Sequence, residues 1–339
     1  MNETIDLENE VTLEKKQEEY EIEEKKETPI IKHLIIPGGG TTGMIAYGAL
    51  KETHESGVWN IENIESIYGT SAGAIVGVIL ALKYDWKTLD EYLIKRPWQN
   101  ICNFNMYAII ESFQKRGIFD IDIIKGIFSP LFLAKDIEID VTLEEFYKIT
   151  KIELHFYTSD LNAFKLVDIS HKTHPDWNVI EAIYASACLP IFFAPFEKDG
   201  DYYADGGLFL NYPLSPCIKC GNKPEEILAI WKRNIEVSQD KVTSESTLFD
   251  YVLILLNKTL QNIIMSSENI MHTKNEIEIN CPFVSIYDLY KMSSSVEERM
   301  RLIEEGIESG RLYCIKGTYG SLKIPPSKGT KVPFRSLLK

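Results

Sequence analysis

The sequence lacks a long uncharged apolar run. One of its longest stretches without a charged residue, Ser66–Leu82, spans only 17 residues, whereas a helix that crosses a bilayer needs about 20 apolar residues. The amino terminus is acidic and has no apolar segment of the kind that export signals contain. We therefore expect a soluble, cytoplasmic protein.

Basic residues are also scarce. The chain has 36 Lys and Arg against 50 Asp and Glu, a formal net charge of -14. Nucleic-acid binding requires clustered basic surface, so we expect no nucleic-acid partner. The six cysteines are irregularly spaced, and the one C-x-x-C pair, Cys217 and Cys220, has no second pair to complete a zinc pattern. This predicts reduced thiols and no metal site.

Charge divides the chain into three parts. Residues 1–29 hold eleven acidic residues against four lysines, which predicts a disordered acidic tail. Residues 310–339 contain seven Lys and Arg and no acidic residue, which suggests a basic tail. Between them, residues 30–309 alternate short apolar strands with helical segments. That alternation predicts one α/β domain with a mostly parallel sheet and helices on both faces.

A glycine-rich loop follows the first predicted strand, Ile30–Ile36. Its sequence satisfies G-x-G-x-x-G through Gly38, Gly40 and Gly43, the fingerprint of dinucleotide-binding folds. That fingerprint expects the second strand to end in an acidic residue that binds ribose. The second strand instead runs into a serine motif, so we expect no nucleotide cofactor.

The serine motif is G-x-S-x-G, formed by Gly69, Ser71 and Gly73 between a predicted strand and a predicted buried helix, Ala72–Leu82. This context is that of a nucleophile elbow, in which a tight turn presents the serine hydroxyl. The two glycines permit close backbone packing, and the helix dipole favours negative charge near Ser71. We therefore predict Ser71 as a nucleophile.

A serine needs a base, and the sequence offers two alternatives. A Ser-Asp-His triad would need a late histidine, and His272 is the only one beyond residue 174. A carboxylate acting directly is the other option. Asp205 ends a short aromatic strand and is followed by Gly206 and Gly207, and dry surroundings would raise its pKa toward the range of a useful base.

These motifs, in this order and spacing, resemble the patatin-like phospholipase family. The matching segments are Gly38–Gly43, Gly69–Gly73, Ala185–Pro195, Asp205–Gly207, and Asn211 with Pro213. The resemblance implies a three-layer α/β/α fold and a lipid acyl hydrolase of phospholipase A type with a Ser71–Asp205 dyad. It also implies an oxyanion hole in the loop of Gly38, Gly39, Gly40, Thr41, Thr42 and Gly43, with Gly39 and Gly40 as the donors.

Two features leave alternatives open. The family usually has a basic residue where this chain has Thr42, so a weakly active or inactive lipid or protein binder is the alternative to a hydrolase. Two segments are candidates for peripheral membrane contact. For the apolar segment Leu248–Met265 the alternative is core packing. For the basic stretch Lys323–Lys339 the alternatives are pairing with the acidic tail and full solvation.

Overall fold

The computed structural model describes residues 29–102, 111–234 apart from 113, 241–259 apart from 249, 253 and 257, 271–281 and 286–319. The predicted acidic tail therefore lies almost wholly outside the described residues, as do residues 320–339 of the predicted basic tail. From Ile31 onward the chain forms one structural unit, and the description below concerns that unit.

The centre of the unit is an eight-stranded sheet in the order β10-β9-β1-β2-β4-β8-β7, with β5 also paired to β4. Neighbouring strands in the β10-β9-β1-β2-β4 run are parallel, and β5, β7 and β8 join it by antiparallel pairing. The strands are β1 (His33–Ile36), β2 (Ser66–Thr70), β4 (Glu153–Asp160), β5 (Lys165–Ile169), β7 (Phe196–Lys198), β8 (Asp201–Asp205), β9 (Ile227–Asn234) and β10 (Glu276–Cys281). A smaller sheet pairs β3 (Gly117–Phe119) with β6 (Ile191–Phe193).

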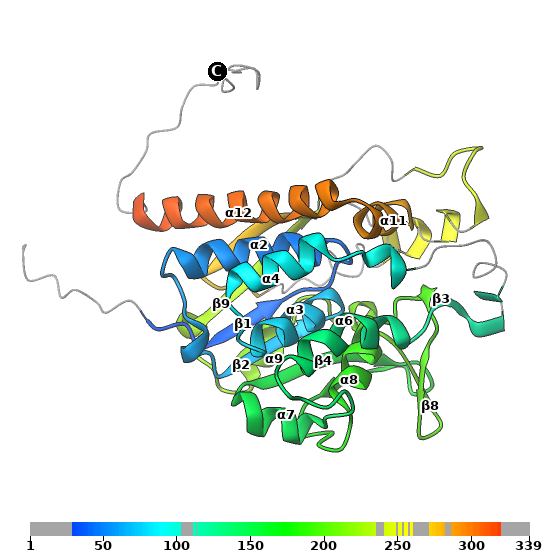
Figure 1. Ribbon diagram of the computed structural model, residues 1–339, viewed down its shortest axis with the longest axis horizontal. Helices are drawn as coiled ribbons and strands as arrows, with labels where there is room; N and C mark the ends of the chain where they lie inside the picture. The colour runs from blue at the N-terminus through cyan, green and yellow to red at the C-terminus, as the bar shows by residue number, and fades with distance from the viewer. Residues whose placement is uncertain are drawn as a thin grey trace, which may run out of the picture. The chain divides into compact units, whose positions relative to one another are not determined.

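Helices cover both faces of the central sheet (Figure 1). They are α2 (Thr42–Glu55), α3 (Ala72–Ala81), α4 (Trp86–Lys95), α6 (Asp122–Leu133), α7 (Leu143–Thr150), α8 (Val179–Ala187), α9 (Leu214–Lys219), α11 (Ile286–Ser294) and α12 (Val296–Tyr319). Short 3-10 turns η1 (Ile61–Asn63), η2 (Trp98–Asn100), η3 (Gly206–Leu208) and η4 (Pro224–Glu226) connect them.

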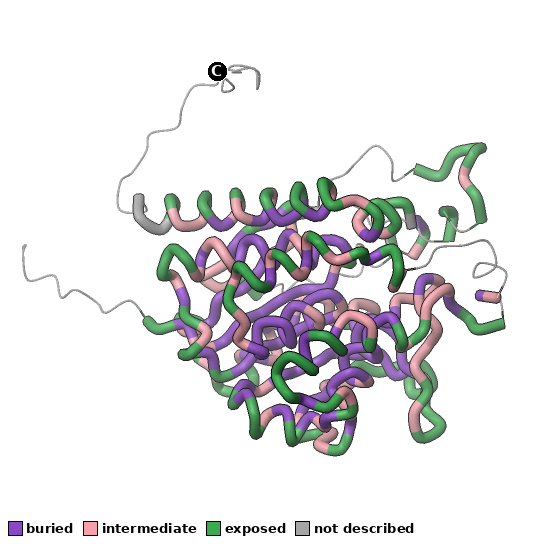
Figure 2. Tube along the Cα trace, in the orientation of Figure 1, coloured by how far each residue is buried: buried purple, intermediate pink, exposed green. Residues whose placement is uncertain are grey.

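Alternation along the strands divides the core into two layers. Leu34 and Ile36 of β1 belong to the large apolar cluster formed with most of the helices, whereas Ile35 faces a smaller cluster that includes Leu214 and Cys217 of α9. Strands and inward helix faces are buried, and the outer side of α12 is exposed (Figure 2). The predicted three-layer α/β/α fold is therefore confirmed.

Helix α12 lies along α2 and is longer than expected (Figure 1). We predicted a helix ending at Glu308, but α12 continues to Tyr319, so the predicted domain boundary at 309/310 falls inside a helix. The helix continues past Glu308 because its last turns pack against α2. A Cβ on Gly310 would lie 3.0 Å from the Ala49 carbonyl oxygen of α2, so this glycine permits close helix approach and does not end α12.

The sequence also predicts a last strand at Phe283–Tyr287. Residues 282–285 lie outside the described residues, and Ile286 and Tyr287 begin α11. A strand that we did not predict, β10, occupies Glu276–Cys281. On this edge strand Ile277 and Ile279 are buried and Glu278 between them is exposed, a period-two pattern masked by the acidic residues Glu276 and Glu278. Among the described residues, no helix has the length and apolar character needed to cross a membrane.

Candidate active site

Ser71 lies in a strained turn between β2 and α3. Its backbone has φ 54° and ψ -121°, a conformation that non-glycine residues rarely adopt. The turn is tight on both sides: a Cβ on Gly73 would collide with the Ile36 carbonyl, and one on Gly69 would lie 2.8 Å from the Ala74 backbone nitrogen. This is the strand–turn–helix geometry that an exposed nucleophile requires.

A buried serine on α8 holds this turn in place. The backbone N–H of Ser71 donates to the Ser186 hydroxyl oxygen, 3.0 Å away, and the Ser186 hydroxyl donates to the Tyr157 carbonyl at 2.7 Å. Ser186 has no exposed surface. The Ser186 hydroxyl therefore bonds both to the Ser71 N–H and to the Tyr157 carbonyl of β4. These two bonds fix Ser71 against the sheet.

Strand β4 brings Asp205 to the serine. Thr70, which precedes Ser71, pairs with Tyr157 of β4, and Asp205 at the end of β8 pairs with the next β4 residue, Thr158. The two side chains come close enough for the Ser71 hydroxyl to hydrogen-bond to the Asp205 carboxylate. Ser71 and Asp205, which are far apart in the chain, thus meet at the carboxyl end of β2.

The surroundings of Asp205 change its acidity. The residue is only 4% exposed, and burial raises the pKa of its carboxyl group to about 6, against the opposing effects of the Ser71 hydrogen bond, the Gly207 N–H and the charge of Lys232. Gly207 donates its N–H to Oδ1 of Asp205 at 2.7 Å. A carboxylate with this pKa is a far better proton acceptor near neutral pH than one in water.

The glycine loop lies against the elbow. A Cβ on Gly38 would lie 2.9 Å from Ser71 Cβ and 2.6 Å from Asn211 Oδ1, so only glycine fits there. The Gly38 N–H donates to the Asn211 carbonyl, and the N–H groups of Thr42 and Gly43 donate to loop carbonyls as α2 begins.

Three backbone N–H groups of the glycine loop, those of Gly39, Gly40 and Thr41, have no hydrogen-bond acceptor within the described residues. Thr42 Oγ1 donates to the Gly39 carbonyl at 2.6 Å and so supports the loop from inside. The arrangement leaves backbone N–H groups available for an anion beside Ser71.

The histidine alternative receives no support from the geometry. His272 precedes β10, at the amino-terminal end of the parallel strands, where its Nδ1 contacts Glu276 at 2.9 Å and its ring packs on Trp231. Ser71 follows the carboxyl end of β2. The other five histidines bond to neither Ser71 nor Asp205 in the described residues.

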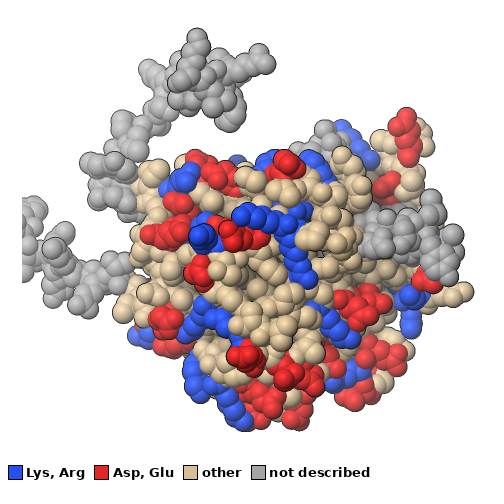
Figure 3. Space-filling view, in the orientation of Figure 1, with Lys and Arg blue, Asp and Glu red and all other residues tan. Residues whose placement is uncertain are grey.

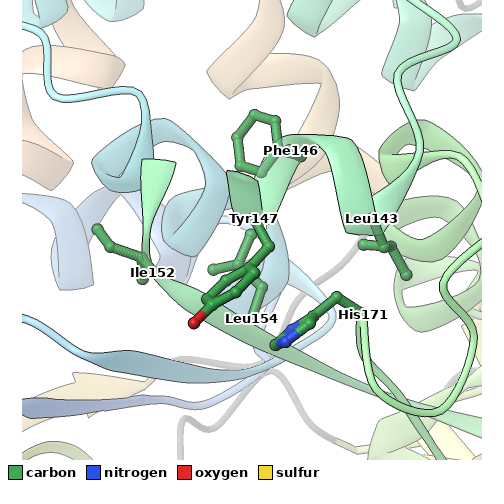
Figure 4. A pocket seen from close by; sticks show the side chains of 6 residues that line it. All are labelled: Leu143, Phe146, Tyr147, Ile152, Leu154 and His171. Carbon is green, nitrogen blue, oxygen red and sulfur yellow. The ribbon is translucent and has the colours of Figure 1, made fainter. Parts of the chain in front are cut away.

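A small apolar hollow lies beside the start of β4 (Figure 4), whereas Ser71 follows the carboxyl end of the parallel strand β2. It is lined by Leu143, Phe146, Tyr147, Ile152, Leu154 and His171, and the Tyr147 and His171 rings stack with centroids 3.8 Å apart. Its residues flank the start of β4, so the hollow is separate from the serine site. No cluster of metal-ligating side chains occurs in the described part of the chain.

The charges of the surface are mixed. On the face drawn in Figure 3, acidic and basic side chains are interspersed. No broad basic field appears on this face.

Sequence patterns identified Ser71, Asp205 and the glycine loop, but missed two residues that the fold adds. Ser186 lies inside the segment Ala185–Pro195 that we matched to the family, yet nothing in its spacing indicated a contact with Ser71. Lys232 lies near the end of β9, and only the structure places it near the loop.

Comparison with known proteins indicates the family of the chain. A family model described as patatin-like phospholipase matches residues 34–218. A protein of Invertebrate iridescent virus 6 named "Probable lipid hydrolase 463L" is 24% identical over 278 residues, which are 81% of this chain and 89% of the relative. The uncharacterized protein R571 of Acanthamoeba polyphaga mimivirus is 26% identical over 185 residues, 55% of this chain and 61% of that protein.

Solved structures share the fold. VipD from Legionella pneumophila aligns with a TM-score of 0.51 and 19% identity, over 85% of this chain and 67% of VipD. Fold and family match together define a hydrolase of the class that acts on lipid esters. The chain belongs to the patatin-like phospholipase family, whose model matches more than half of its length.

Proposed function

We propose that the protein is a lipid acyl hydrolase of phospholipase A type in which Ser71 is the nucleophile and Asp205 its general base. The observation that carries the proposal is the buried Asp205 carboxyl, with a pKa raised by burial to about 6, hydrogen-bonded to a serine on a strained elbow. At neutral pH the Asp205 carboxyl is largely ionised, so it can accept the hydroxyl proton of Ser71 as the serine attacks.

The reaction proceeds in two halves. Ser71 Oγ attacks the acyl carbonyl while its proton moves to Asp205, and the N–H groups of Gly39 and Gly40, with that of Thr41, stabilise the oxyanion. Asp205 then returns the proton to the leaving alcohol, which leaves an acyl group on Ser71. A water molecule deprotonated by Asp205 attacks this ester, and the fatty acid departs as Ser71 recovers its proton.

An exposed aromatic pair beside the site supports lipid contact. Phe209, four residues after Asp205, packs edge-on against Phe164 of the β4–β5 turn, with ring centroids 5.0 Å apart. Phe164 is 72% exposed and Phe209 36%. We infer that this pair enters the interfacial region of a lipid surface, because exposed aromatic rings favour that environment. Of the two membrane segments expected from sequence, Lys323–Lys339 lies outside the described residues. In Leu248–Met265, the exposed side chains include Leu248 and Leu255.

The experiment compares fatty acid release from mixed phospholipid micelles, with calcium chelated, by the native chain, Ser71→Ala and Asp205→Asn. Asp201→Asn, an exposed aspartate on the same strand as Asp205, is the matched control. We expect both dyad variants to lose at least a thousandfold in rate and the control to keep native activity. Equal activity of the native chain and Ser71→Ala would sink the proposal and favour a non-catalytic binder.

A further inference from the structure

Lys232 reaches the glycine loop from the neighbouring strand. The pairing of Ile35 with Ala229, carried forward along β1 and β9, brings Lys232 level with Gly38, just beyond the end of β1. Its side chain follows Leu228 and Ile230 on the helix-rich side of the sheet. A Cβ built on Gly39 would lie 3.4 Å from Lys232 Cδ, so the aliphatic stem passes directly over this glycine.

The ammonium group of Lys232 has no partner among the residues that the structure describes. Within the described residues, no carboxylate pairs with it and no acceptor bonds to it, although the side chain is partly buried. Arg233, the next residue, shows the contrast: it points the other way and pairs with Glu278 at 3.3 Å. A partly desolvated cation without a counter-charge is costly unless an anion joins it.

The Lys232 ammonium group is close enough to the Ser71–Asp205 pair to act on it electrostatically. The loop of residues 38–43 contains no charged side chain. Of the charged groups in the described chain, Lys232 is the one whose charge acts on Asp205, where it lowers the carboxyl pKa against the larger raising effect of burial. An anion bound to Lys232 would therefore lie beside the acyl ester that Ser71 attacks.

We propose that Lys232 binds the phosphate of a glycerophospholipid substrate and so sets a preference for phospholipids over neutral glycerides. The proposal rests on the proposed function, since it places the headgroup of the same lipid whose ester is cleaved. In a glycerophospholipid the phosphodiester is only a few bonds from the acyl esters, which matches a cation next to the glycine loop. A flexible lysine provides a point charge suited to this contact.

The first test compares two lipids that differ only in the headgroup. The native chain, Lys232→Gln, Lys232→Arg and the control Arg233→Gln are assayed on phosphatidylcholine and on diacylglycerol with the same acyl chains in the same micelles. In assays at pH 8, well above the pKa of Asp205, we expect Lys232→Gln to lower kcat/KM on phosphatidylcholine at least tenfold and to lower the diacylglycerol rate much less, because on diacylglycerol only the effect of its charge on Asp205 is lost. Lys232→Arg should keep most of the preference, and Arg233→Gln all of it.

An equal loss on both lipids would overturn the proposal, because it would assign Lys232 to the Ser71–Asp205 pair. No loss on either lipid would overturn it as well. A second arm measures binding of monomeric short-chain phosphatidylcholine to Ser71→Ala, with and without Lys232→Gln, in the presence and absence of inorganic phosphate. We expect at least tenfold weaker binding without the lysine and little competition by inorganic phosphate.

This binding arm decides the inference even if the native chain hydrolyses no lipid, an outcome that would refute the proposed function alone. Identical affinity of the two Ser71→Ala chains would overturn the role of Lys232. Full competition by inorganic phosphate would likewise contradict it, by showing a site for free phosphate.

Discussion

The backbone N–H of Ser71 donates a hydrogen bond to the side chain of Ser186, 3.0 Å away on a different helix. The same hydroxyl donates to the Tyr157 carbonyl. A residue without contact to the substrate thus holds the nucleophile in a conformation that it would not adopt unaided.

Ser186→Ala should loosen this elbow. Two buried groups lose their partner, so we expect about 1–3 kcal/mol lower stability. We also expect roughly tenfold lower kcat with a nearly unchanged KM, because small displacements of a nucleophile slow the chemistry more than binding. Urea unfolding and ester hydrolysis measure both effects. Ser170→Ala, which removes another fully buried hydroxyl at the end of β5, is the control. Equal activity of the two variants would exclude a positioning role for Ser186.

The pH dependence of activity follows from Asp205. A general base works in its ionised form, which prevails above its pKa, and burial raises that pKa to about 6. We expect kcat/KM on an uncharged ester to be flat above about pH 7 and to fall tenfold per pH unit below about pH 6. A profile between pH 4 and 8 measures this. An acid limb that begins near pH 4 would mean that the base is a solvated carboxylate and not Asp205.

Gly38→Ala tests the contact between the glycine loop and the elbow. The added methyl would meet Ser71 Cβ at 2.9 Å and Asn211 Oδ1 at 2.6 Å, so the loop must move away from the nucleophile. We expect a loss of at least a hundredfold in kcat, in line with the loss of an oxyanion donor. Gly77→Ala in α3, where the methyl meets only the Ile67 side chain at 3.1 Å, is the matched control. Similar rates for the two variants would show that the loop tolerates displacement.

A buried charge network away from the site controls stability. Burial alone would lower the pKa of His155, but its hydrogen bonds with Asp168 and Glu153 outweigh burial and raise that pKa to about 9. A pKa raised above its unfolded value of 6.5 adds stability below about pH 6.5, and this contribution is lost as the pH rises through 9.

His155→Gln should therefore cost about 3 kcal/mol at pH 6, because it removes the cation between Asp168 and Glu153, of which Glu153 still pairs with Lys172. The cost should shrink by pH 10, where the native imidazole is neutral. Denaturant unfolding of both chains at the two pH values measures it. A cost independent of pH would mean that His155 stabilises the fold through packing, for example through its stacking on Tyr68 at 4.2 Å, and not through charge.

Local patterns predicted much of this molecule. Apolar periodicity and caps are local properties, and β1, β2, β4, β9, α2, α3, α7 and α8 lie within a few residues of the ranges that they predict. In that order, the predicted ranges are Ile30–Ile36, Ile64–Tyr68, Leu154–Asp160, Ile227–Lys232, Gly43–Glu55, Ala72–Leu82, Thr142–Thr150 and Asn178–Ala187. β10 was not predicted because acidic residues on one face hid its alternation. The end of α12 was missed because Gly310 serves contact with α2, which only the folded chain reveals.

The residues of the candidate site fall into two groups, those that local sequence motifs indicate and those that only the fold brings together. Ser71 and Asp205 are marked by the glycines around them, since tight turns need glycine at fixed offsets. Ser186 and Lys232 are marked by nothing local. Ser186 acts on a residue 115 positions away, and Lys232 reaches the loop because β9 pairs with β1, a choice of strand order that periodicity does not encode.

The most direct test of the central claim is to trap the acyl group on the protein. The native chain, Ser71→Ala and Asp205→Asn are mixed with a slowly deacylated activated ester, quenched with acid and analysed by peptide mass spectrometry. Our account predicts one acyl adduct in the native chain, on the peptide that contains Ser71, and none above background in either variant. An adduct on another residue, or hydrolysis that persists in Ser71→Ala, would contradict it.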